Sequence, residues 1–107
     1  MPKYMIQASY SVDGIKGVLK EGGTSRRTAV AAAIKSMGGT LEAFYFTFGD
    51  TDVVGIADVP DNVSAAAFSM GVAASGTLTG AKTTVLLTPE EIDQAAKKTM
   101  AFRAAGR

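Results

Sequence analysis

The chain has 107 residues, which fit one domain, and its 11 Lys and Arg residues against 10 Asp and Glu residues leave a net charge of +1. This balance gives no electrostatic footprint for nucleic acid or an anionic membrane surface. The absence of Cys and His removes disulfides, thiolate nucleophiles, the commonest general base and the commonest metal ligands. No apolar run is long enough to span a membrane, and the N-terminus lacks a signal-peptide core. We therefore expect one cytoplasmic domain over residues 1–107 that uses no cofactor and binds neither nucleic acid nor membrane.

Small side chains dominate the composition. The chain holds 18 Ala and 12 Gly residues, while aromatic residues make up 7% and Trp is absent. A core of such side chains fills little volume per residue, so burial against a partner subunit would help to stabilise this chain.

The chain begins with the alternation typical of a strand. Over Lys3–Tyr10, successive side chains are expected to point to opposite sides of an extended chain, which divides them into two sets. Ser11 then suits the N-cap of a short helix over Val12–Lys20, which Gly22 and Gly23 end. The two alternating sets are Tyr4, Ile6, Ala8 and Tyr10, and Met5, Gln7 and Ser9.

A second helix follows the glycine pair. We expect Thr24 or Ser25 to be its N-cap, and Gly38 with Gly39 to stop it. Its apolar residues recur at the spacing i, i+3, i+4 and i+7, which places them on one face. These residues are Val30, Ala33, Ile34 and Met37.

The middle of the chain predicts a hairpin. Thr40–Phe48 alternates, and the side that carries three Phe residues is expected to face the helices. Gly49–Asp52 forms the turn, and Val53–Val59 is the returning strand, either face of which is mostly uncharged. The two sides of the first strand are Glu42, Phe44, Phe46 and Phe48, and Leu41, Ala43, Tyr45 and Thr47.

Three further elements follow the hairpin. Asp61 or Asn62 is expected to cap a helix, after which a loose connection leads to a short strand. Thr88–Glu91 has the pattern of a capping box with Pro at the first helical position, which begins a terminal helix. The expected bounds are Asp61–Ala74 for the helix, Thr77–Lys82 for the connection and Thr83–Leu87 for the strand.

The element order predicts an α+β fold of the ferredoxin-like, split βαβ class, with an additional C-terminal helix. Two right-handed crossovers would place the helices on one face of a four-stranded antiparallel sheet. The other face has few charges, and such a face usually packs against something. We therefore expect a homodimer, or a multiple of dimers, joined through this open sheet face by two-fold symmetry. The alternative is a monomer with an uncharged surface.

Several stretches of the chain resemble the GYD domain family of small bacterial and archaeal proteins. The Gly-Tyr-Asp pattern of that family falls near Gly49–Asp52, where Thr51 occupies the position of the Tyr. The resemblance implies a ferredoxin-like relative of the dimeric α+β barrels, and it implies no reaction. The resembling stretches are Tyr4–Tyr10, Leu19–Arg27, Leu41–Gly49, Val59–Asn62, Ala73–Gly76 and Lys82–Glu91.

The first candidate site is the glycine-led start of the second helix. Backbone N–H groups at a helix N-terminus, two hydroxyls and two guanidinium groups together suit a phosphate or carboxylate. Neighbouring helical residues point about 100° apart, so only one of the two Arg side chains can easily face such an anion. The alternative is a helix break whose arginines are solvated or lie in an interface. The candidate residues are Gly22, Gly23, Thr24, Ser25, Arg26 and Arg27.

The second candidate is the acidic turn. Asp50 and Asp52, with Glu42 on the preceding strand, suit a divalent cation or acid–base chemistry. Asp is also common in turns for backbone reasons alone. A third interpretation pairs Asp52 with Arg26 or Arg27 in a structural salt bridge.

The third candidate is the pair Tyr10 and Tyr45, on strands that we expect to be neighbours. With the polar residues around them, the two phenols can orient a small polar or aromatic ligand. The alternative is ordinary interface packing, for which Tyr is well suited. The surrounding polar residues are Gln7, Ser9 and Thr47.

Two classes of function remain. The first is a non-catalytic homo-oligomeric module that binds itself and a small anionic metabolite. The second is a cofactor-free enzyme of the dimeric-barrel type, an isomerase or monooxygenase acting on a small aromatic or lactone substrate. The absence of His and Cys favours the first class, because acid–base work would depend on Tyr, Asp, Glu or Lys.

Overall fold

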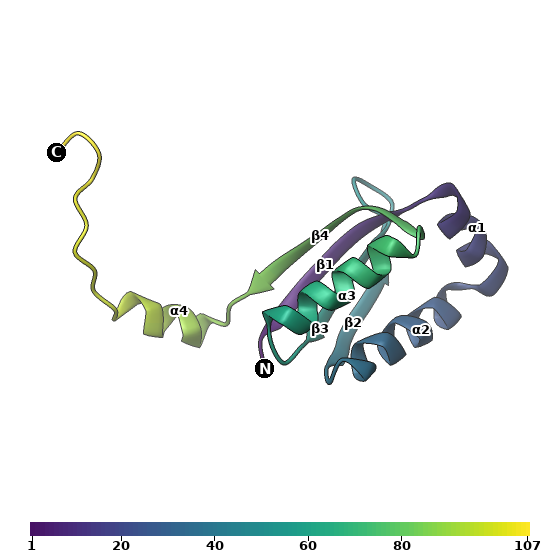
Figure 1. Ribbon diagram of the computed structural model, residues 1–107, viewed down its shortest axis with the longest axis horizontal. Coiled ribbons are helices and arrows are strands. Elements are labelled where there is room, and N and C mark those ends of the chain that lie inside the picture. The colour runs from purple at the N-terminus through teal and green to yellow at the C-terminus, as the bar shows by residue number, and fades with distance from the viewer.

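Eight elements follow one another in a computed structural model that describes residues 1–107 (Figure 1). They are β1 (Lys3–Tyr10), α1 (Val12–Glu21), α2 (Gly23–Ser36), β2 (Thr40–Phe46), β3 (Val53–Asp58), α3 (Asn62–Ala74), β4 (Leu78–Leu86) and α4 (Pro89–Ala96). The strands pair antiparallel in the order β2-β3-β1-β4, and α2 and α3 lie on the same face of the sheet (Figure 1). The predicted ferredoxin-like α+β fold is confirmed.

The core lies between the sheet and the two covering helices. On β3, Val53, Gly55 and Ala57 are buried beneath the helices, so the other side of this strand, which carries Val54 and Ile56, belongs to the open face. The apolar stripe predicted for α2 also turns inward, with Ile34 1% exposed. The central cluster consists of Tyr4, Ile34, Ala57, Val59 and Ala65.

A β-bulge in β2 overturns part of the predicted alternation. The register with β3 shifts between Leu41 and Ala43, so two residues of β2 oppose one of β3. Leu41 therefore packs against the core, whereas we expected it on the open face. Glu42 moves the other way and meets Lys3 on the open face. Alternation alone does not reveal the extra residue, and so the prediction for both side chains was wrong.

The end of the aromatic run also differs from the prediction. Phe44 and Phe46 do face the helix side, where their rings meet edge to face with centroids 5.4 Å apart. Phe48 lies beyond the end of β2 and is fully exposed, so it faces no helix.

The expected loose connection over Thr77–Lys82 is mostly strand. β4 begins at Leu78, and its pairing with β1 shifts register between Gln7 and Ser9. Gly80, with φ of +60°, lies in this irregular stretch, where glycine adopts the left-handed conformation without steric cost. The small and polar residues there hid the strand from pattern analysis.

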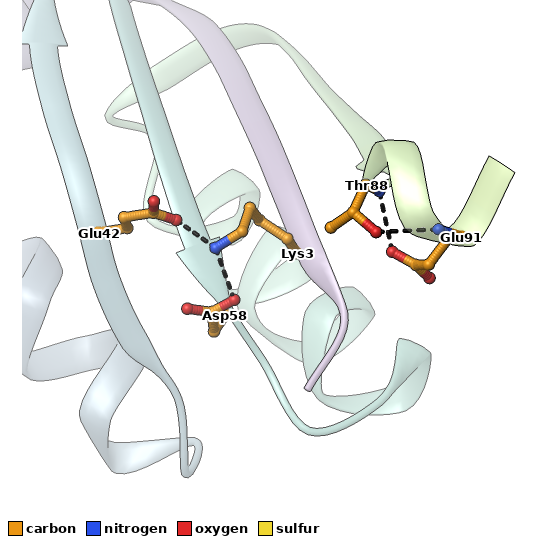
Figure 2. Close-up of polar contacts among 5 residues, drawn as sticks. All are labelled: Lys3, Glu42, Asp58, Thr88 and Glu91. Atoms are coloured by element: carbon orange, nitrogen blue, oxygen red, sulfur yellow. Dashed lines mark hydrogen bonds and ion pairs between the residues drawn. The ribbon is translucent and has the colours of Figure 1, made fainter. Parts of the chain in front are cut away.

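Three of the four expected helix starts are confirmed. Ser11 caps α1, Asp61 caps α3, and Thr88 forms the complete capping box with Glu91 at α4 (Figure 2). The start of α2 is different, because its N-cap is Gly22 and no side chain caps it. Gly22 has φ of +89°, and this left-handed turn lets α2 follow α1 almost without a break.

The last 21 residues leave the domain. We call Leu87–Arg107 the C-terminal arm; it contains α4 and extends away from the sheet (Figure 1). The radius of gyration is 17.0 Å, whereas a compact chain of this length has about 13 Å. None of the helices is both long and apolar enough to cross a membrane.

The contact between α1 and Thr77, the residue before β4, provides a test of the packing. A Cβ atom on Gly14 would lie 2.1 Å from the carbonyl oxygen of Thr77, so Gly14→Ala should destabilise the protein by about 1–3 kcal/mol. Gly17, in the same helix, has open space at its Cβ position, so Gly17→Ala should stabilise it by about 0.5–1 kcal/mol. Urea unfolding measures both changes, and shifts of the same sign would contradict the close approach at Gly14.

The cap of α3 predicts a pH dependence. The N–H of Ser64 donates to the Asp61 carboxylate at 2.8 Å and holds the pKa of Asp61 below its ordinary value of 3.8. The ionised cap therefore contributes stability above about pH 4, which is lost as the pH falls through the lowered pKa. Asp61→Asn caps without titrating, so the melting temperature of the wild type should fall relative to the variant below about pH 4. A difference that does not change with pH would argue against the ionised cap.

Candidate functional site

A cavity of about 560 Å³ lies between α2, α3 and the helix-covered face of the sheet. Its walls are mostly apolar, with Ile6, Phe44 and Phe68 among the larger side chains. Small residues four apart on each helix, Ala29 with Ala33 and Ala67 with Gly71, line the cavity. Such pairs face one side of a helix, so little side-chain volume fills the space between the layers. The volume falls in the range of small-molecule pockets.

Four of the six polar residues that line this cavity lie at one end of it, where β1 and α3 end and α2 begins. Tyr10, Arg26, Ser75 and Thr77 contribute to its lining there. Arg26 carries the only charged side chain among the lining residues. A smaller pocket of about 220 Å³, which shares Arg26, Ser75 and Thr77, adjoins it beside α1. Arg26 therefore stands between an apolar chamber and a polar one.

Arg26 is incompletely paired. Its Nε atom is buried and has no hydrogen-bond partner, and its Nη1 atom lies 3.9 Å from the nearest carboxylate oxygen of Glu21. That distance is too long for a hydrogen bond, so the interaction is only a loose ion pair. A buried N–H group without an acceptor carries a desolvation cost that a bound acceptor would remove.

Tyr10 places a hydroxyl donor beside this guanidinium group. Burial raises the pKa of Tyr10 above its ordinary value of 10.0, the positive charge of Arg26 opposes that rise, and the Asp52 carboxylate adds to it. The phenol is therefore protonated at neutral pH. Its ring stacks on Phe46 with centroids 6.3 Å apart, and its backbone N–H donates to Asp52 at 2.9 Å, so strand and side chain are both held in place.

The glycine-led candidate contributes one residue to the cavity. Of the six residues proposed from the sequence, only Arg26 lines it. Thr24, Ser25 and Arg27 are exposed, as is Gly22. Gly23 lies beneath Phe46, where a Cβ atom would come within 2.9 Å of the ring. The expectation that only one of the two arginines can turn inward agrees with this arrangement.

The acidic candidate is dispersed. Asp52 accepts the N–H of Tyr10, Glu42 pairs with Lys3 (Figure 2), and Asp50 is exposed. No group of three or more acidic side chains is placed to hold a metal ion. No ion pair joins Asp52 to either arginine, so the alternative interpretation of Asp52 as a salt-bridge partner is wrong.

The tyrosine pair is also separated. β3 lies between β1 and β2, so the expectation of neighbouring strands was wrong. Tyr10 faces the cavity, whereas Tyr45 pairs with Val54 on the open face and is 67% exposed. Gln7 pairs with Val54 and Lys82 in the same row of the open face. Tyr10 and Tyr45 therefore serve different surfaces.

One charged cluster marks the end of the open face. Lys3 Nζ donates to Asp58 at 2.9 Å and also contacts Glu42, as Figure 2 shows. Glu42, and after it Asp58, raise the pKa of Lys3 above its ordinary value of 10.5. The middle of the face is uncharged, since Thr84, Met5, Ile56 and Ala43 form one row across the sheet.

Sequence reasoning missed most of the cavity. Ser75 and Thr77 were not proposed as site residues, and nor was any apolar wall. The available signal was the spacing of small residues by four on both helices, at Ala29 with Ala33 and Ala67 with Gly71. That pattern is ordinary in alanine-rich helices, and only the layer arrangement shows that the small residues face each other.

Comparisons with known proteins identify the family. No curated protein sequence matches the chain. A crystal structure of an uncharacterised NIPSNAP domain protein from Burkholderia xenovorans is similar to 82% of this chain and 94% of its own, with a TM-score of 0.47 and 16% sequence identity. The family model of the GYD domain matches residues 4–96, and the chain therefore belongs to the GYD domain family.

Proposed function

We propose that the protein is a non-catalytic module that binds a small amphipathic anion in the cavity between α2 and α3. The observation that carries this proposal is the buried, unpaired Nε of Arg26 at one end of a mostly apolar chamber. An apolar body would fill the chamber, while a carboxylate or phosphate would lie against the guanidinium group. Arg is suited to both anions because its planar donors match their oxygens.

The energetics favour such a ligand over a neutral one. Apolar surface buried on binding contributes about 25 cal/mol per Å² before the costs of association. A hydrogen bond between charged groups contributes about 1.5–3 kcal/mol. The Tyr10 hydroxyl can donate a second hydrogen bond to the same anion, because it stays protonated. Glu21 competes for Arg26 only weakly, at 3.9 Å and from a half-exposed position.

The lining favours binding over catalysis. The cavity contains no Asp, Glu or Lys side chain, and the chain has neither His nor Cys. Tyr10 and Arg26 are the ionisable groups that line it; the raised pKa of Tyr10 keeps its phenol protonated at neutral pH, and a guanidinium group offers donors but no acceptor. A general base is therefore missing from the walls, which is why the isomerase or monooxygenase interpretation ranks second.

The same module associates with itself in our proposal. The open sheet face has an uncharged middle row, and no element of the chain covers it (Figure 1). Tyr45 projects from this face at the β2 edge, and Tyr is favoured where a surface packs against another protein. Two copies related by two-fold symmetry would cover both faces at once.

Calorimetric titration with decanoate tests the ligand proposal. Arg26→Gln should weaken decanoate binding by about ten- to hundredfold, because the ligand loses a charge-assisted hydrogen bond. Glu21→Gln should strengthen it by a few-fold, since the guanidinium group loses its competing partner. Arg27→Gln is the matched control, because Arg27 is exposed, and should leave the affinity unchanged.

Neutral and headgroup-only probes complete this test. Decanol should bind more weakly than decanoate, and inorganic phosphate alone should bind weakly because it leaves the apolar walls uncovered. Equal decanoate affinity in all four proteins, or decanol binding as tightly as decanoate, would place the site away from Arg26.

Tyr45→Lys tests the self-association. A lysine there would bury an unpaired charge against the second copy, which should raise the dimer dissociation constant at least about tenfold. Phe48→Lys is the control, because that aromatic side chain is fully exposed beyond the end of β2. Light scattering over a dilution series gives the mass, and the same dissociation constant for both variants would contradict an interface on the open face.

A further inference from the structure

The C-terminal arm has the features of a segment built to pack. α4 begins with a complete capping box, Thr88 with Glu91, and with Pro89 at its first position (Figure 2). Yet no residue of α4 is buried. Isolated helices shorter than about 12–15 residues are marginal in water, and α4 has 8 residues. A helix this short and this well capped requires a surface to hold it.

The arm also exposes apolar side chains in series. Leu87 is 58% exposed, Ile92 50%, Met100 80% and Phe102 73%. These side chains are unfavourable in a tail that is surrounded by water, because each exposes a large apolar surface to the solvent. This copy of the chain therefore leaves the apolar side chains of its own arm largely uncovered.

The geometry keeps the arm away from its own domain. Only Leu87 and Thr88 separate the end of β4 from the start of α4, and the cap fixes how the helix leaves this short link. Figure 1 shows α4 and the tail beyond it extending away from the sheet, at the end where β1 begins. In this orientation, α4 buries none of its residues against the rest of the chain.

We infer that the C-terminal arm packs on a second copy of this chain, so that two copies exchange arms. The inference rests on the homodimer proposed above and adds to it the segment that each copy contributes. Leu86, the last residue of β4, pairs with Lys3 on the open face, so the arm starts where that face ends. Whatever covers the open face lies next to the arm.

The size of the open face supports this arrangement. Four strands spaced about 4.8 Å apart, with six or seven paired residues each, give an outline of about 20 by 20 Å. A standard protein interface buries roughly 800 Å² on each partner. The outline of the open face is smaller than this area. A dimer interface on this face would therefore be enlarged by the apolar surface of the arm, which begins immediately beyond Leu86.

A single tryptophan can report on the arm, because the natural chain has none. In Phe102→Trp, we expect the emission maximum to move to shorter wavelength as concentration rises, over the range in which light scattering shows the mass doubling from 11.0 kDa. Gln94→Trp is the matched control, since Gln94 lies about 200° around α4 from Ile92. Its emission should stay close to that of a solvated indole.

The possible results separate the two proposals. A doubled mass, with the indole emission of Phe102→Trp still solvent-like, would overturn arm exchange and leave the homodimer standing. Shielded emission in dilute monomer would mean that the arm folds back on its own chain, which also overturns the exchange. A mass of 11.0 kDa at all concentrations would reject the dimer and, with it, the exchange.

A second variant guards against a local effect of the indole. Ile92→Asp should raise the dimer dissociation constant at least about tenfold, because it places a charge on the packing side of α4. Gln94→Asp adds the same charge on the opposite side and should leave the constant within about twofold. An equal effect of both substitutions would contradict packing through the Ile92 side.

Discussion

The spacing between the sheet and its two covering helices is the constraint on which the rest of this structure depends. Ala33 and Gly71 line opposite walls of the space, and Gly55 lies on the sheet beneath them. Larger side chains at these positions would fill the layer and complete an ordinary core. With small ones, the backbone of the fold is kept and a chamber of about 560 Å³ remains. The same composition that weakens the core thus creates the candidate site.

The left-handed turn at Gly22 determines what meets this chamber. It joins α1 to α2 without a loop, so Glu21 at the end of α1 lies near Arg26 in the first turn of α2. The guanidinium group is directed to the cavity by this junction, while Arg27 on the next helical position remains exposed. The glycine pair therefore sets the direction of α2, and it does not itself line the cavity.

The fold was predictable from the sequence because its signals are local and agree with one another. Alternation in β1, the turn over Gly49–Asp52 and the caps at Ser11, Asp61 and Thr88 each act within a few residues. The bulge in β2 was not predictable, since an inserted residue leaves the alternation intact on both sides of it. It depends on the pairing of β2 with β3, and that pairing moves Glu42 into the cluster with Lys3.

The candidate site was harder to predict for a related reason. A periodic pattern tells which side of a helix is buried, but it does not tell whether the facing side chains fill the space between two elements. Arg26 was among the residues proposed from the sequence. The walls of the cavity were not, because Ala and Gly carry no chemical signal of their own. The separation of Tyr10 from Tyr45 likewise follows from strand order, which places β3 between them.

An underfilled interior and an uncovered exterior have the same thermodynamic consequence. Any species that binds the folded chain and not the unfolded one stabilises the fold by mass action. In our proposals an amphipathic anion fills the inner chamber, and a second copy covers the open face and receives the arm. These surfaces lie on opposite sides of β1, with Tyr10 facing one and Met5 the other. Ligand binding and self-association would therefore stabilise the same strand from its two faces, without competing for any side chain.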